Sequence, residues 1–100
     1  MIIEEVKEQD QLILKIKGRL DTTTAPQLEQ ATGEKLTGLQ KLVLDFTALE
    51  YISSAGLRVL FLAQKIMNRQ GKMVVRGANE NVMEVFEITG SVDIMTIEKG

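Results

Sequence analysis

The feature that most constrains the fold is a short apolar run followed by an amphipathic helix pattern, with a hydroxyl-bearing junction between them. Residues 41–46 form the run, which is typical of a buried strand, and an apolar stripe that begins at Leu57 predicts a helix to about Gln70. A strand that leads into a helix favours a parallel sheet covered by helices. The junction, Tyr51-Ile52-Ser53-Ser54-Ala55-Gly56-Leu57, places two hydroxyls at the helix amino terminus, a position that suits a phosphate.

The rest of the chain repeats this alternation of strands and helices. We expect an opening hairpin of strands 2–6 and 12–17, later strands over 72–76 and 94–97, and helices over 25–36 and 79–88. A chain of 100 residues can bury one modest core, so residues 1–100 are expected to form one domain. The predicted class is α/β, with a mixed, largely parallel sheet of four to five strands and about three to four helices.

The helix expected over 25–36 has a specific start signal. Thr24 can cap its amino terminus, and Gln27 can return the hydrogen bond in a capping box. Pro26 is tolerated in the first turn of a helix. These residues predict a capping box over residues 24–27.

The residue types that the chain lacks exclude most catalytic and metal sites. With no Cys and no His, it cannot build a disulfide, a thiolate or imidazole metal site, or a Ser-His catalytic pair. A net charge of −2 with mixed signs favours no nucleic-acid partner, and no segment resembles a membrane span or a signal peptide. We therefore expect a cytoplasmic protein with no membrane insertion, no metal and no cofactor.

Two polar positions are expected to meet at one edge of the sheet. In open α/β sheets, ligands and partners usually meet the carboxyl ends of the strands. Asp21 follows the second expected strand, and Ser53 with Ser54 follows the third. If those strands are neighbours, the carboxylate and the hydroxyls share one rim.

These residues resemble a known family, the anti-sigma factor antagonists of the STAS class. The resemblance covers nearly the whole chain. It rests on the hairpin, on Gly18-Arg19-Leu20-Asp21 with Thr24-Ala25-Pro26, on Leu42-Val43-Leu44-Asp45-Phe46, on the junction 51–57, and on Gly71 before the next strand. It implies a STAS-like domain that acts in transcription regulation by partner switching rather than as an enzyme.

The resemblance also implies the partner and the site. The unmodified module binds an anti-sigma factor that is also a serine kinase, which releases the bacterial sigma factor, and phosphorylation ends that binding. Aligned on Gly56-Leu57, the phosphoacceptor falls on Ser54, and a PP2C-type phosphatase is a possible second partner. The expected partner-binding residues are Asp21, Thr22, Ser53, Ser54, Ala55, Gly56 and Arg58.

Structural roles are open for the same residues. Ser53 and Ser54 can cap a helix, Gly56 can be a point of close packing, and Asp21 can be a turn residue that holds Thr23 or Thr24. The basic residues of the same helix, Arg58, Lys65 and Arg69, can be either a solvated face or a docking stripe.

Three other functions remain open. Ser53 stands where the family usually has Asp, and Ala55 where it usually has a second hydroxyl, which favours an unphosphorylated STAS subunit of a transport or signalling assembly. A small hydrolase with Ser54 as nucleophile lacks a base, because Lys65 lies about three helical turns away. Nucleotide binding also remains open, although the chain has neither glycine-rich phosphate-binding pattern.

Overall fold

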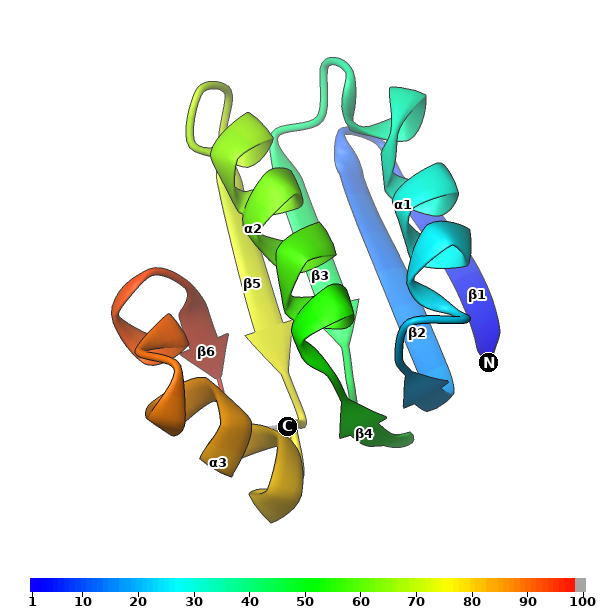
Figure 1. Cartoon of the computed structure of the whole chain (residues 1–100). Coiled ribbons are helices and arrows are strands. Elements are labelled where there is room, and N and C mark those ends of the chain that lie inside the picture. Colours follow the sequence, from blue (N-terminus) through cyan, green and yellow to red (C-terminus); the bar gives the residue numbers. More distant parts are fainter. Residues whose placement is uncertain (99–100) are drawn as a thin grey trace.

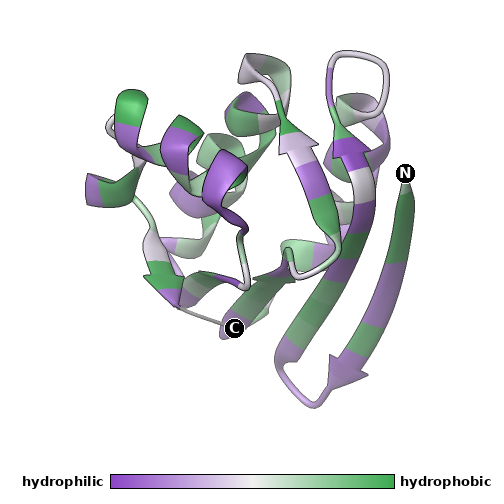
Figure 2. Ribbon diagram, turned by 90° about the horizontal axis from the view of Figure 1, so that it is seen from below, coloured by the Kyte–Doolittle hydropathy of each residue, from purple (hydrophilic) through white to green (hydrophobic). Residues whose placement is uncertain are grey.

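The chain begins with a long antiparallel hairpin in the computed structural model, which describes residues 1–98. Strand β1 is Ile2–Glu8 and strand β2 is Gln11–Leu20, so the hairpin expected from the sequence is confirmed and is longer at both strands. A two-residue turn joins them, with Gln9 at a φ of 53°. Figure 2 shows the alternating hydrophobic and hydrophilic bands along both strands, as expected where one face of a strand packs on a core.

Four further strands complete a mixed, mostly parallel sheet. Its order is β1-β2-β3-β5-β6, in which β3 is Lys41–Asp45, β5 is Lys72–Arg76 and β6 is Thr96–Glu98. Strand β4, Leu49–Ile52, lies off this path and pairs in parallel with β2. The predicted α/β class is confirmed, but the sheet has six strands rather than four to five.

The extra strand exists because β2 changes partner along its length. Its first half pairs with β3, and from Gly18 onward it pairs with β4, with an irregular register between Gly18 and Arg19. Gly18 has a φ of 99°, a left-handed conformation that suits glycine, and its N–H donates to the Ala48 carbonyl at 3.1 Å. Strand β4 has buried residues only at its two ends, so its sequence lacks the alternation that predicts a strand.

Three helices cover one face of the sheet (Figure 1). Helix α1 is Ala25–Thr32, α2 is Ser54–Met67 and α3 is Glu80–Ile88. Helix α1 ends earlier than expected because the backbone leaves the helical conformation at Gly33. A separate 3₁₀ turn over Glu34–Leu36 then places Leu36 in the core. Helix α2 also ends three residues early, and β6 begins two residues later than the strand expected over 94–97.

The core lies between the helices and the sheet. It is built almost entirely from aliphatic side chains, with Phe46 and Phe86 as its largest members. Leu12, Leu14 and Ile16 point from β2 into this core, while Lys15 and Lys17 alternate with them on the opposite, open face of the sheet. Lys99 and Gly100, the last residues of the expected 1–100 domain, lie outside the described residues.

The open face of the sheet carries a row of charges that alternate in sign. The register places five residues side by side on successive strands: Glu4, Lys15, Asp45, Arg76 and Glu98. Arg76 Nη2 lies 3.5 Å from Asp45 Oδ2, and Glu4 also pairs with Lys17 at 2.8 Å. Opposite charges on neighbouring strands are mildly stabilising, so this face neutralises its own charges.

Candidate functional site

The carboxyl ends of β2 and β4 form the edge at which the candidate site lies. Leu20 and Ile52 are paired in parallel, and the Ser53 N–H donates to the Leu20 carbonyl at 2.9 Å. The chain then leaves the sheet at Asp21 on one side and at Ser53 and Ser54 on the other. The predicted meeting of the acid and the hydroxyls at one rim therefore holds, but the strand before Ser53 is β4 and not the apolar strand over 41–46.

Asp21 holds the turn that follows β2. Its Oδ1 accepts hydrogen bonds from the Thr23 hydroxyl at 2.8 Å, the Thr23 N–H at 3.0 Å and the Thr24 N–H at 3.2 Å. The hydrogen bond from the Thr23 hydroxyl is the largest influence on the pKa of Asp21, and with the other donors it outweighs desolvation, so the pKa lies below its ordinary value of 3.8. The turn role is thus real, and the carboxylate stays ionised at neutral pH.

The predicted capping box at Thr24 and Gln27 is wrong. The Thr24 hydroxyl accepts from the Asp21 N–H at 2.8 Å and donates to the Arg19 carbonyl at 2.8 Å, so it faces back toward β2. Its side chain makes no hydrogen bond to helix α1. Gln27 Nε2 instead lies 3.4 Å from the Met1 carbonyl oxygen. The competing acceptor and donor at the end of β2 explain why the threonine does not cap the helix.

The two serines of the junction differ in accessibility. Ser53 is the N-cap residue of α2, with an extended backbone, and its carbonyl accepts the first helical hydrogen bond from Leu57 N at 3.0 Å. Its hydroxyl is buried and has no hydrogen-bond partner among the described residues. Ser54, the first residue of the helix, is exposed. Ser53 therefore occupies the expected capping position, but its side chain makes no capping hydrogen bond. Of the two serines, only Ser54 offers its hydroxyl to another molecule.

Gly56 lies beneath the rim, where α2 meets the strand ends. A Cβ added there would be 2.7 Å from Leu20 Cγ and 2.9 Å from Ile52 Cγ1. Gly56 is buried, so its position fits the close-packing role. It lets the helix amino terminus approach β2 and β4, and this sets where Ser54 stands relative to Asp21.

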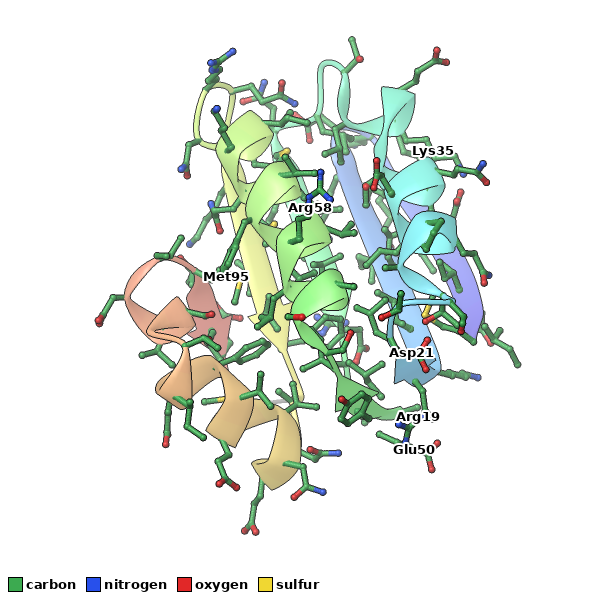
Figure 3. All side chains as sticks on the ribbon, viewed as in Figure 1. Arg19, Asp21, Lys35, Glu50, Arg58 and Met95 are labelled. Carbon is green, nitrogen blue, oxygen red and sulfur yellow. The ribbon has the colours of Figure 1, made fainter. Side chains whose placement is uncertain are left out.

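Arg19 and Tyr51 add a second polar feature that the sequence did not predict. They are partners across β2 and β4, and the Arg19 guanidinium lies 4.3 Å from the centre of the Tyr51 ring. Arg19 Nε also lies 3.9 Å from Asp21 Oδ2. Figure 3 shows Arg19, Asp21 and Glu50 gathered at this end of the molecule. Arg19 and Tyr51 both lie in motifs identified from the sequence. Because no pattern predicted β4, the sequence did not indicate that the two residues are neighbours.

Thr22, Ala55 and Arg58 surround a hollow between α1 and α2. The hollow measures about 200 Å³, and Ala25, Pro26, Glu29 and Val59 complete its lining. Arg58 is exposed and lies farther along α2 than the rim (Figure 3). The expected partner-binding residues thus form one region, in which Gly56 and the Ser53 hydroxyl are buried while Thr22, Ser54 and Arg58 are exposed.

The described residues offer little other chemistry. Within residues 1–98, no group of three or more Asp and Glu side chains is arranged to hold a metal ion. In the same part of the chain, every helix is too short or too polar to cross a membrane. An exposed hydroxyl at the positive end of a helix, on the same rim as an ionised carboxylate, suits modification and partner contact.

Comparison with known proteins identifies the family. The chain matches the STAS domain over residues 3–100. It is 39% identical over 88 residues to BtrV of Bordetella bronchiseptica, a protein described as an anti-sigma factor antagonist, and the alignment covers 86% of this chain and 76% of that one.

Solved structures share the fold. The crystal structure of a Thermotoga maritima protein described as an anti-sigma factor antagonist aligns with a TM-score of 0.89 at 22% identity, over 98% of this chain and 86% of the other. The phosphorylated form of the Bacillus cell fate determinant SpoIIAA aligns with a TM-score of 0.76 at 13% identity, over 97% of this chain and 91% of the other. The chain therefore belongs to the STAS domain family.

Proposed function

We propose that this protein is an anti-sigma factor antagonist, which binds an anti-sigma factor through the rim at the ends of β2 and β4 and thereby releases a sigma factor. The exposed Ser54 beside the turn of Asp21 is the observation that carries the proposal. The 39% identity to a relative described as such an antagonist supports it. An anti-sigma factor works on RNA polymerase subunits, so the proposal places the protein in the bacterial cytoplasm.

Phosphorylation of Ser54 is the proposed off-switch. The anti-sigma factor would itself be the serine kinase, and a PP2C-type phosphatase would reverse the modification. A phosphoserine adds about −1.5 to −2 charges at neutral pH, and at a helix amino terminus a negative group gains about 0.3 to 2 kcal/mol. The modified protein is therefore expected to keep its fold. A STAS protein of the same fold, SpoIIAA, is known in a phosphorylated form.

Partner binding responds in the opposite direction. A phosphate at Ser54 would have to be buried beside the ionised Asp21 when the partner docks. An uncompensated buried charge costs about 3 kcal/mol or more, which is about a hundredfold in affinity. The same modification thus leaves the fold intact and dissolves the complex.

The protein acts without catalysing a reaction in this proposal. Ser54 lacks a base that could make it a nucleophile, because the sequence has no His and Lys65 lies eleven residues along the helix. Ser53 in place of the usual Asp favours the alternative of an unphosphorylated STAS subunit in a larger assembly. That alternative keeps partner binding at the rim but predicts no change of affinity on incubation with kinase and ATP.

The test is a titration of Ser54 variants against each purified anti-sigma factor of the source organism. We expect Ser54→Ala to bind as tightly as the unmodified wild type, and Ser54→Asp to bind at least about tenfold more weakly. Ser53→Ala is the matched control, since it removes the neighbouring, buried hydroxyl.

Mass spectrometry after incubation with the bound anti-sigma factor and ATP completes the test. One added phosphate on Ser54, absent from Ser54→Ala, is expected. Equal affinities of Ser54→Ala and Ser54→Asp for the anti-sigma factor would refute the switch. If the wild-type protein binds none of the anti-sigma factors, the antagonist function itself is refuted.

A further inference from the structure

A continuous groove runs along the seam between α1 and α2. The hollow beside Thr22 and Ala55 shares two lining residues, Glu29 and Val59, with a second hollow of about 550 Å³ farther along the same helices. The second hollow extends to Gly33 on one side and Gln70 on the other. Helix α1 has 8 residues and is about 12 Å long, while α2 has 14 residues and is about 21 Å long, so the two helices together flank about two turns of a second helix.

One ridge of α2 joins the candidate phosphoacceptor to this groove. Ser54, Arg58, Leu62 and Ile66 follow one another at intervals of four residues, and all four are exposed. The exposed fractions of Leu62 and Ile66 are 43% and 41%, and both residues line the second hollow, so they form one exposed apolar patch. The ridge is therefore polar where it meets the rim and apolar beyond.

The charges around the groove are of one sign except at Glu29. Arg58, Lys65 and Arg69 line it, and among residues 1–98 none of these three cations takes part in an ion pair. The open face of the sheet differs, because its charges alternate and pair with one another. An apolar floor edged by unpaired cations is complementary to an amphipathic helix with acidic flanks.

We propose that the groove between α1 and α2 binds an amphipathic, acid-flanked helix of the anti-sigma factor. This inference rests on the function proposed above and adds the chemistry of the bound segment. Leu62 and Ile66 contact the apolar face of that helix, and Lys65 and Arg69 attract its acidic flanks. The docked helix points toward Ser54, so a phosphate there repels the acidic end of the same segment.

The apolar contact is tested with the double variant Leu62→Ser/Ile66→Ser. Its affinity for the anti-sigma factor identified in the Ser54 titration is expected to fall at least about tenfold, measured by fluorescence anisotropy. The matched control is Ile88→Ser/Ile94→Ser, which removes exposed aliphatic side chains outside the groove and should leave the affinity within about twofold. Circular dichroism verifies that both variants are folded.

The charges are tested separately with Lys65→Glu/Arg69→Glu. This variant is expected to associate at least about tenfold more slowly at low salt, and high salt should reduce the difference. The control Lys7→Glu/Lys72→Glu changes the net charge equally on other exposed surfaces. An equal slowing by both variants would mean that overall charge alone is responsible, and would overturn the acidic flank.

The outcomes separate the two proposals. If the wild type binds no anti-sigma factor, the proposed function fails and the groove assignment fails with it. If the wild type binds and Leu62→Ser/Ile66→Ser binds equally well, only the groove assignment fails. A concentration-dependent dimer that this variant abolishes, seen by light scattering, would assign the groove to a second copy of the chain and overturn the proposal.

Discussion

Replacing Gly56 by Ala tests whether close approach of α2 to the strand ends holds the rim together. The added Cβ would lie 2.7 Å from Leu20 Cγ and 2.9 Å from Ile52 Cγ1, well inside the 3.5 to 4.0 Å at which carbon atoms pack best. Leu20 Cγ is the branch point of its side chain, and Ile52 Cγ1 is bonded directly to the branched Cβ, so both atoms lie close to the backbone of buried residues and cannot swing aside freely.

The magnitude follows from two opposing terms. Overpacking of a filled core costs about 1 to 3 kcal/mol, and replacing Gly by Ala in a helix returns at most about 1 kcal/mol. Two contacts under 3.0 Å place the overpacking in the upper part of its range, at about 2 to 3 kcal/mol. After about 1 kcal/mol is returned, Gly56→Ala is expected to lower the free energy of unfolding by about 1 to 2 kcal/mol. In a domain of this size, that lowers Tm by about 4 to 16 °C.

The assay is thermal unfolding followed by circular dichroism. Gly33→Ala serves as the control, because a Cβ at Gly33 would meet its nearest neighbour, the Glu29 carbonyl oxygen, at an ordinary 3.5 Å. In a Leu20→Ala background, the cost of Gly56→Ala should shrink by at least about 0.5 kcal/mol, since the obstructing Cγ is gone. A Tm of Gly56→Ala equal to or above that of the wild type, or costs that simply add, would refute the steric reasoning.

Two further predictions concern backbone contact and ionisation. Gly71→Ala is expected to cost more than Gly56→Ala, about 3 kcal/mol or more in urea unfolding, because its Cβ would lie 2.0 Å from the Gln40 carbonyl oxygen and a backbone cannot rotate away; near-wild-type stability would contradict this. Thr23→Val removes the hydroxyl that donates to Asp21 and should raise the pKa of Asp21 toward 3.8, as followed by NMR titration. Because the pKa of Asp21 is lower in the folded state than in the unfolded state, the ionised carboxylate stabilises the fold above the unfolded pKa. This stabilisation is lost as the pH falls through the folded pKa. The wild type should therefore lose more stability than Thr23→Val on acidification below about pH 4. An unchanged midpoint in the variant would show that the hydroxyl does not set this pKa.

Local patterns predicted most of the elements in this fold. The second strand of the hairpin alternates between the two faces at Leu12, Leu14 and Ile16, and Leu57 to Met67 form a helical stripe. Such periodicities arise because one face of each element is buried. Errors occurred where non-local contacts decide the outcome, as at the Thr24 hydroxyl, which bonds to the end of β2 instead of to its own helix.

The sequence predicted residues of the candidate site but not the strand pairing that brings them together. The resemblance to the STAS class marked Ser54 and Asp21, and their adjacency was expected from the general behaviour of parallel sheets. The sequence did not predict β4, so it could not place Arg19 beside Tyr51 or show that Ser53 points inward. The groove beyond Arg58 likewise requires two helices that are neighbours in space.

The sequence by itself determined the α/β class, the absence of thiol and imidazole chemistry, and a hydroxyl at the start of the central helix, because residue type and spacing are local properties of the chain. The tertiary structure alone decided that β2 exchanges β3 for β4 at Gly18, and that the Ser53 hydroxyl is buried while Ser54 is exposed. Those outcomes depend on which segments pack together, since burial and strand pairing are set by residues distant in sequence.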